Sequence, residues 1–423
     1  MISADLVVRN CRQLVTCRGP IPKRKAELAD VGLVKNGWIA SDRGTIVFVG
    51  SENEFQEEIK PRASCLWVDG EGLVALPGFV DPHTHLPFAG NREDEFALRL
   101  KGYTYMQLAE MGLGIQTTVR ATRRATREEL VALCLSRLDQ MLLHGTTTCE
   151  AKSGYGLNME DEVKQLEALQ ELGKIHPVEI VPTFMGAHEI PPEYKDRKED
   201  YIDLLIREVL PEVKKKKLAE YFDIFCEDGV FSLEDTRRLV AAAKEAGLKI
   251  KIHADEFAPL GGAQLAAEVG AASAEHLINI SQDGIQKLAE SGTAAVLLPA
   301  VSFFLQLEKR APARKLIDSG AVVALASDFN PGSSMTESML FVLQLAVYTL
   351  KMSIEEAINA STANAAYAIG RDDEAGSLET GKRMDLVLWD VPSFSTLVYH
   401  LGINPIRRVI KNGKTVVMDG DIA

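Results

Sequence analysis

Short apolar, β-branched runs alternate with helix-like stretches from residue 76 onward, and this alternation restricts the fold more than any other feature. Eight runs are present, at residues 73–83, 145–153, 178–188, 221–229, 248–257, 272–277, 294–302 and 322–330. Near-continuous apolar strands separated by helices are typical of a parallel sheet that helices cover. Eight βα units over roughly 300 residues fit a (β/α)8 TIM barrel better than an open doubly wound sheet.

The two ends of the chain have a different pattern, with short strand-like runs and turn residues. Residues 4–75 and 383–418 both show it. Because these β-rich ends flank one barrel, we expect them to pair into a small β-sandwich domain. The predicted division is 1–75 and 376–423 for the two parts of that domain, and 76–375 for the catalytic barrel.

Charge and cysteine content argue against several classes of protein. The chain of 423 residues has a formal net charge of −13, whereas a nucleic-acid-binding protein normally has a basic face. Its six cysteines are scattered without a C-x-x-C pair, as in a reduced cytosolic protein. The N-terminus has no signal-peptide pattern, and the apolar run 294–305 is too short to span a bilayer. We therefore expect a cytoplasmic protein without nucleic-acid or membrane partners.

Two histidines separated by one residue follow the first run, in GFVDPHTHLPFAG (residues 78–90). Side chains alternate along a strand, so His83 and His85 are expected to point to the same side. At the carboxyl end of a barrel strand this side is the mouth, where TIM-barrel active sites are built. Two imidazoles at this spacing suit a divalent transition metal.

Other candidate ligands follow other strands. His253 lies toward the carboxyl end of the fifth run and Asp328 toward that of the eighth, and His188 and His276 lie at the carboxyl ends of the third and the sixth. Five of the eight histidines thus lie at predicted strand carboxyl ends. This arrangement favours a metal site over surface histidines.

These positions resemble the amidohydrolase superfamily, which has H-x-H on strand 1, His on strands 5 and 6, and Asp on strand 8. Longer segments are similar to the members that open the cyclic amide of 4-imidazolone-5-propanoate to N-formimidoyl-L-glutamate in L-histidine degradation. The likeness covers essentially the whole chain and is strongest in DPHTHLPFAGNREDEF, EAKSGYGLNMEDE, FMGAHEIPPEY, IFCEDGVFSLEDTRR, KIHADEF and ASDFNPGSSMTESM. The sequence departs from the usual family pattern at two places. It has GLGIQTTVRATR where a GGGI-like opening is usual, and Glu275 where Asp is common. Neither place contains a candidate ligand.

The resemblance implies a homodimeric hydrolase with one Zn²⁺ or Fe³⁺ per subunit. The implied ligands are His83, His85, His253 and Asp328, which would leave an open position for a water whose pKa the metal lowers toward ~7. Larger superfamily members bridge two metals with a modified lysine on strand 4. The fourth run here, YFDIFCEDG, has no lysine.

Catalytic roles are implied for Glu256, His276 and Asp328. Glu256 follows His253 by three residues, and both a proton-transfer role and a substrate hydrogen bond stay open for it. His276 is expected to hydrogen-bond the attacking water or the developing oxyanion. Asp328 is expected to accept a proton from that water as well as to bind the metal.

Substrate contacts are expected from the loops around the mouth. A propionate tail requires a cation, and Arg92 offers a bidentate fork for it. Tyr155 and His188 can donate hydrogen bonds to the carboxylate or the ring carbonyl. The resemblance also assigns substrate and product binding to the turn after the eighth run, through Asn330, Gly332 and Ser333.

Two other functions stay open at this stage. One is a deaminase or cyclic-amidine hydrolase that acts on a nucleobase-like substrate, and the other is a non-catalytic barrel used for assembly. Arg92 and the SGYG segment favour a substrate with a carboxylate over a neutral base. The presence of all four candidate ligands favours an enzyme over an assembly protein.

Overall fold

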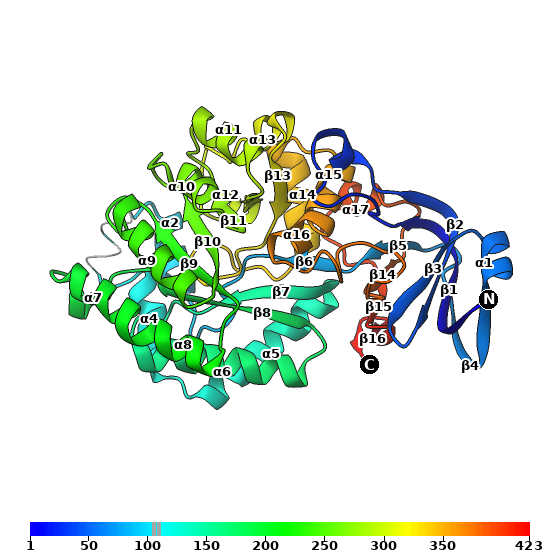
Figure 1. Cartoon of the computed structure of the whole chain (residues 1–423), viewed down its shortest axis with the longest axis horizontal. Coiled ribbons are helices and arrows are strands. Elements are labelled where there is room, and N and C mark those ends of the chain that lie inside the picture. The colour runs from blue at the N-terminus through cyan, green and yellow to red at the C-terminus, as the bar shows by residue number, and fades with distance from the viewer. Residues whose placement is uncertain (104–106, 108–110) are drawn as a thin grey trace.

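The computed structural model describes residues 1–103, 107 and 111–423, and its centre is an eight-stranded parallel barrel (Figure 1). Strands adjacent in the sequence pair in parallel throughout. A bridge between Thr84 and Phe329, just past the first and last strands, brings the two edges together. The strands are β6 (Phe79–Asp81), β7 (Thr146–Lys152), β8 (Glu179–Ala187), β9 (Tyr221–Cys226), β10 (Lys249–Ala254), β11 (Ser273–His276), β12 (Ala294–Leu297) and β13 (Val322–Leu325). The predicted (β/α)8 barrel is confirmed.

Helices cover the outside of the barrel (Figure 1). In α5, Leu130, Cys134, Leu138 and Met141 are buried at intervals of three or four residues, which is the apolar stripe of a helix packed on a sheet. The helices are α2 (Glu93–Leu100), α4 (Ile115–Arg124), α5 (Arg127–Leu143), α6 (Met159–Ile175), α7 (Lys198–Leu204), α8 (Leu210–Lys216), α9 (Leu233–Glu245), α10 (Gly262–Glu268), α11 (Gln282–Glu290), α12 (Pro299–Phe304), α13 (Ala313–Ser319), α14 (Met339–Leu350), α15 (Ile354–Ala360) and α16 (Ala363–Ala368).

Both ends of the chain contribute to a second, nine-stranded sheet, on the right in Figure 1. Its strands are β1 (Ile2–Val15), β2 (Leu33–Asp42), β3 (Thr45–Gly50), β4 (Ile59–Asp69), β5 (Val74–Pro77), β14 (Leu386–Trp389), β15 (Ile406–Lys411), β16 (Lys414–Met418) and β17 (Asp421–Ile422). The short helix α1 (Glu52–Glu58) contacts this sheet, whereas α17 (Thr396–Tyr399), which follows β14 in the chain, packs against α14. Strand β5 pairs with β1 and with β14, so it joins the N-terminal and C-terminal parts. Leu6, Ile39, Leu386 and Ile410 share one apolar core. The predicted domain boundaries stay a prediction.

The first predicted strand is two strands in different sheets. β5 belongs to the chain-end sheet and β6 to the barrel, with Gly78 between them. A Cβ at Gly78 would overlap the side chain of Thr147, so the chain can pass from one sheet to the other here only without a side chain. As a result, His83 and His85 lie just past the end of β6 rather than within a strand.

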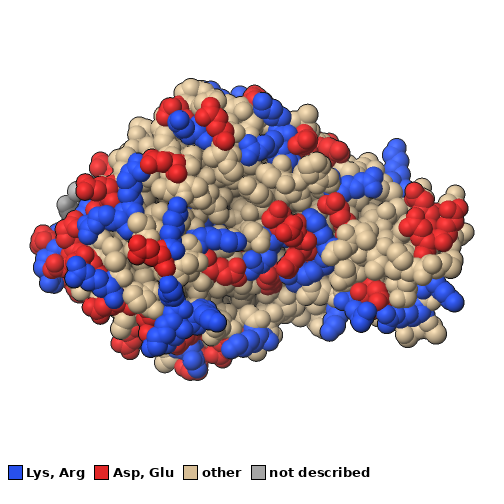
Figure 2. All heavy atoms as spheres, viewed as in Figure 1, with Lys and Arg blue, Asp and Glu red and all other residues tan. Residues whose placement is uncertain are grey.

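The surface in Figure 2 shows acidic and basic side chains interspersed over most of this face, with a compact acidic group at its right end. Among the residues with a described position, no helix combines the length and apolar character that crossing a membrane requires.

Candidate active site

A cavity of about 590 Å³ lies at the mouth of the barrel. It is lined by every site residue predicted from the sequence except His83, which lies fully buried beside it. The predicted residues along its wall are His85, Arg92, Tyr155, His188, His253, Glu256, His276, Asp328, Asn330, Gly332 and Ser333. The structure therefore brings the predicted residues together from the carboxyl ends of several strands.

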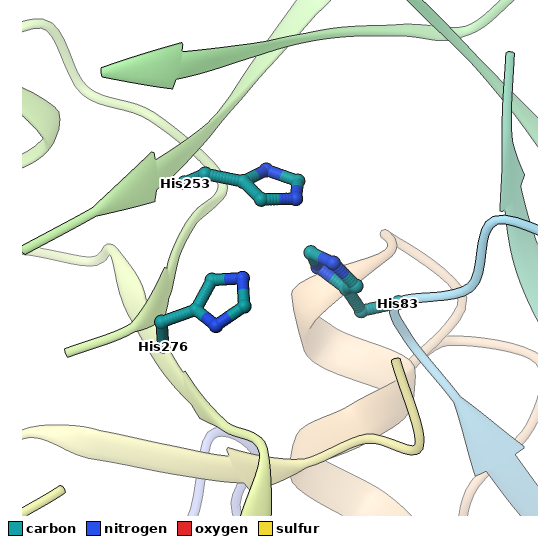
Figure 3. A group of neighbouring side chains, drawn as sticks. All are labelled: His83, His253 and His276. Atoms are coloured by element: carbon teal, nitrogen blue, oxygen red, sulfur yellow. The ribbon is translucent and has the colours of Figure 1, made fainter. Parts of the chain in front are cut away.

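The candidate metal ligands converge at the bottom of this cavity. His83 Nε2 and His85 Nε2 each lie 3.3 Å from Asp328 Oδ1. The ring centroids of His83 and His253 are 4.5 Å apart. Figure 3 shows His83, His253 and His276 facing one another from three different elements. One ring nitrogen of each lies within 4.8 Å of those of the other two.

The donor atoms at this point fit a metal ion. His83 Nε2, His253 Nε2 and Asp328 Oδ1 are buried and have no hydrogen-bond partner among the described residues. Leaving buried polar atoms unpaired costs free energy, and coordination to a cation would recover it. Imidazole nitrogens with a carboxylate oxygen form a typical ligand set for a catalytic transition metal. The site therefore has the chemistry of a metal centre.

A carboxylate behind His253 fixes the orientation of its ring. His253 Nδ1 lies 3.1 Å from Asp223 Oδ1, on the neighbouring strand β9. An imidazole whose Nδ1–H donates to a carboxylate presents Nε2 to a metal, and such outer contacts tune the ligand. Burial would raise the pKa of Asp223, but His253 and Lys152 hold it well below its usual range. Asp223 therefore stays ionised behind the ligand.

The three proposed catalytic groups have displaced pKa values. Burial would raise the pKa of Asp328, but its close contacts with His83 and His85 hold it well below its usual range. Burial, with the charges of Asp328 and Glu227, raises the pKa of Glu256 well above 4.5. Burial lowers the pKa of His276 to about 4. These shifts favour the ionised form of Asp328 and the neutral forms of Glu256 and His276.

Arg92 lies at the mouth of the barrel, but two of its three guanidinium nitrogens already donate hydrogen bonds to Glu95. Its Nε donates to Glu95 Oε2 at 2.8 Å and its Nη2 to Glu95 Oε1 at 2.5 Å. Its third nitrogen, Nη1, lies beside Gly332, where an added Cβ would collide with it. Gly332 thus leaves room for the guanidinium, and Arg92 presents one edge rather than its whole fork to the cavity.

Tyr155 and His188 lie against the candidate metal ligand His85. The His188 ring stacks on that of His85, with centroids 4.9 Å apart, and Tyr155 is 5.3 Å from His188. His188 Nδ1 lies 2.9 Å from the Gly154 carbonyl, so Nδ1 carries the proton. Burial and the neighbouring histidines lower the pKa of His188 well below 6.5, which leaves its Nε2 as an acceptor.

The turn after β13 uses most of its polar groups internally. Asn330 Oδ1 accepts from the backbone N–H of Gly332 and of Ser333, both at 2.8 Å. Asn330 Nδ2 donates to the Asp328 carbonyl at 2.7 Å and to Ser333 Oγ at 2.9 Å. All three predicted residues line the cavity, and their mutual bonds shape the wall beside Asp328.

Two charged residues of α2 are among the cavity residues that the sequence did not predict. Glu95 and Arg99 lie three and seven residues after Arg92, on the same face of α2. Arg99 Nη2 donates to the Gly332 carbonyl at 2.9 Å, and its Nε is buried without a hydrogen-bond partner among the described residues. The i, i+3, i+7 spacing after Arg92 was the signal that could have revealed them.

Known proteins show the same organisation. A model of the amidohydrolase family matches residues 74–416. The imidazolonepropionase of Alkaliphilus oremlandii is 48% identical over 422 residues and covers 100% of both chains. The imidazolonepropionase of Geobacillus kaustophilus is 50% identical over 420 residues and covers 99% of both chains.

Solved structures show the same fold at low sequence identity. A triazine hydrolase from Arthobacter aurescens is 18% identical, with a TM-score of 0.75 over 99% of this chain and 96% of its own. An adenosine deaminase from Xanthomonas campestris with bound zinc is 18% identical, with a TM-score of 0.73 over 100% and 95%. The chain belongs to the amidohydrolase family. Within it, the full-length likeness places the chain among the imidazolonepropionases.

Proposed function

We propose that this protein hydrolyses the cyclic amide C–N bond of 4-imidazolone-5-propanoate to give N-formimidoyl-L-glutamate, a step of histidine degradation. The observation that carries the proposal is the full-length identity of 48–50% to imidazolonepropionases. The convergence of His83, His85, His253 and Asp328 at the mouth supports it. A metal ion held by these residues would supply Lewis-acid activation of water and of the amide carbonyl.

In the proposed reaction, side chains of the protein transfer the protons and hydrogen-bond the reacting groups. Ionised Asp328, whose Oδ1 faces two of the ligand histidines, accepts a proton from the attacking water and returns it to the leaving ring nitrogen. His276, neutral at pH 7, lies opposite and hydrogen-bonds the oxygen on which negative charge develops. Protonated Glu256, whose Oε1 lies 3.5 Å from His276 Nδ1, donates a hydrogen bond to the substrate ring.

The substrate tail is held at the rim of the cavity. Arg92 Nη1 meets the propionate, with Glu95 fixing the guanidinium plane from behind. Arg99 supplies a second donor through its unpartnered Nε. Tyr155 donates its hydroxyl to the same end of the substrate, while Nε2 of His188 accepts from a ring N–H. This differs from the donor role expected for His188, because its Nδ1 proton is used by Gly154.

The proposal also covers the identity of the metal, the cellular location and the oligomeric state. The metal is one zinc or one iron ion per subunit, since both accept an imidazole and carboxylate ligand set. The protein acts in the cytoplasm as a homodimer, and light scattering is expected to give twice the 46.3 kDa of one chain. Elemental analysis of protein purified without added metal identifies the ion.

The activity is tested with freshly generated 4-imidazolone-5-propanoate. We expect its ultraviolet absorbance to decay only with enzyme and N-formimidoyl-L-glutamate to appear by mass spectrometry. Asp328→Asn should abolish turnover, whereas His400→Asn, at an exposed histidine that does not line the cavity, should not change it. Ammonia release from a nucleobase without turnover of the imidazolone would replace this proposal with the deaminase alternative.

A further inference from the structure

Two fully buried lysines lie inside the barrel. Lys152 belongs to β7 and Lys251 to β10, and neither exposes any surface. Barrel interiors are usually filled by branched apolar side chains, and lysine is almost never fully buried without a charged partner. Packing alone therefore does not explain two ammonium groups at this depth.

Lys152 is held between two carboxylates. Its Nζ donates to Glu150 Oε1 at 2.8 Å and lies 2.7 Å from Asp223 Oδ2, an ion pair without hydrogen-bond geometry. The other oxygen of Asp223 contacts Nδ1 of the proposed metal ligand His253. Burial lowers the pKa of Lys152, but Asp223 and Glu150 raise it above its usual value, so the ammonium keeps its charge.

Lys251 has the same relation to a different carboxylate. Its Nζ lies 3.2 Å from Glu275 Oε1 and donates to Ser273 Oγ at 2.8 Å. Glu275 Oε1 also lies 3.9 Å from Nδ1 of the proposed ligand His83. Each lysine thus pairs with a carboxylate that stands behind one ligand histidine.

These two carboxylates and two histidines together resemble a second cation site. His83, Asp223, His253 and Glu275 each present one ligand atom within 4.8 Å of the others, and all four side chains are buried. Two imidazoles and two carboxylates form a suitable ligand set for a transition metal. Because His83 and His253 also belong to the proposed metal centre, an ion here would be the second metal of a two-metal centre.

We propose that Lys152 and Lys251 act as resident cations that neutralise Asp223 and Glu275 and so restrict the centre to one metal ion. The inference rests on the proposed metal centre at His83, His85, His253 and Asp328. A second ion in this site would stand beside two ammonium groups and the first ion, and like charges repel strongly in a buried environment. The two lysines are therefore positioning and exclusion residues rather than catalytic ones.

The test counts metal ions after removal of one ammonium group. Wild-type protein equilibrated with excess Zn²⁺ and freed of unbound ion by gel filtration is expected to keep one equivalent per chain. Lys152→Met is expected to keep close to two, because Asp223 and Glu150 lose their cation. Lys152→Arg should return to one equivalent. Co²⁺ gives a second readout, since ligand-field absorption per chain should increase in Lys152→Met.

Matched variants separate this effect from loss of a buried lysine in general. Lys23 is also buried, but its Nζ donates to the carbonyls of Arg18 and Asp30, so Lys23→Met should keep one equivalent. The double variant Lys152→Met/Asp223→Asn should also keep one. If Lys152→Met does not fold, Lys251→Met tests the same prediction through Glu275.

The outcomes are distinguishable. Wild type without any bound metal would contradict the proposed metal centre itself. Wild type with one equivalent and folded lysine variants that also keep only one would overturn the exclusion role while leaving the centre intact. Wild type that takes up two equivalents in spite of both lysines would overturn the inference directly.

Discussion

Arg92 is the residue on which recognition of the substrate carboxylate depends in this account. A carboxylate in a partly desolvated cavity requires a cation, and the loss of one partner of such a pair costs ~2–5 kcal/mol. We expect Arg92→Met to lower kcat/KM for the imidazolone by roughly two to three orders of magnitude and to leave the metal content unchanged. A ring analogue without the carboxylate should be hydrolysed about equally by both proteins.

The Arg92 variant needs a control because it also leaves the buried Glu95 carboxylate without its partner. Arg92→Met/Glu95→Gln removes that unpaired charge and should show the same loss of kcat/KM. Arg92→Lys should not restore activity, since an ammonium cannot satisfy Glu95 and the substrate in one plane. Equal losses for the acid and for the analogue would show that Arg92 is structural.

The pH dependence of KM and the variant Glu256→Gln test whether Glu256 acts as a hydrogen-bond donor or as a general base. Its raised pKa favours the protonated carboxyl, which loses its proton as pH rises through that pKa. If the donor is needed, KM of the wild type should increase on the alkaline side, while Glu256→Gln should show a flat KM and keep kcat/KM within about tenfold. A fall in kcat of ~10²–10⁴ in Glu256→Gln, the range for a lost general base, would contradict the donor role.

At this scale, the sequence predicts which side chains reach the mouth but not how they pair. His253 and Asp328 were predictable because each lies near the carboxyl end of an apolar run, and strand carboxyl ends meet at one face of a barrel. The pairing of Lys152 with Asp223, and of Arg92 with Glu95, depends on contacts between elements or on side-chain direction. The tautomer of His188 likewise depends on the Gly154 carbonyl, which no residue pattern specifies.

At the scale of the elements, the junction between β5 and β6 connects the chain-end sheet to the barrel. Gly78→Ala would press a methyl group into Thr147, so we expect a loss of about 1–3 kcal/mol in the free energy of unfolding. Gly173→Ala is the matched control, because Gly173 lies exposed in α6 with no atom near its missing Cβ. That change should instead stabilise the protein by ~0.4–1 kcal/mol.

Chemical denaturation of both glycine variants measures these differences. An unchanged stability of Gly78→Ala would mean that the junction can relax and that Gly78 is not required. The sequence did not predict this junction, because residues 73–83 form one apolar run in which the change of sheet leaves no polar signal. The other seven runs each correspond to one barrel strand, since turns and helices separate them.

At the scale of the whole molecule, both ends of the chain contribute strands to one sheet. We therefore expect the two ends to stay associated when the chain is cut. Because β5 pairs with β1 on one side and β14 on the other, a cut in the N-terminal part should leave its fragment bound to the rest. We expect limited proteolysis to produce fragments that stay together during gel filtration. Free release of residues 1–70 with the C-terminal segment still protected would contradict the predicted small domain.

We propose that one metal ion, held by His83, His85, His253 and Asp328, makes this barrel an enzyme that hydrolyses 4-imidazolone-5-propanoate. The most direct test is a titration of metal-depleted protein with Zn²⁺ or iron while hydrolysis is followed by ultraviolet absorbance. We predict that activity is absent at the start, rises linearly and stops rising at one equivalent per chain. Activity without metal, or a break at two equivalents, would contradict the account.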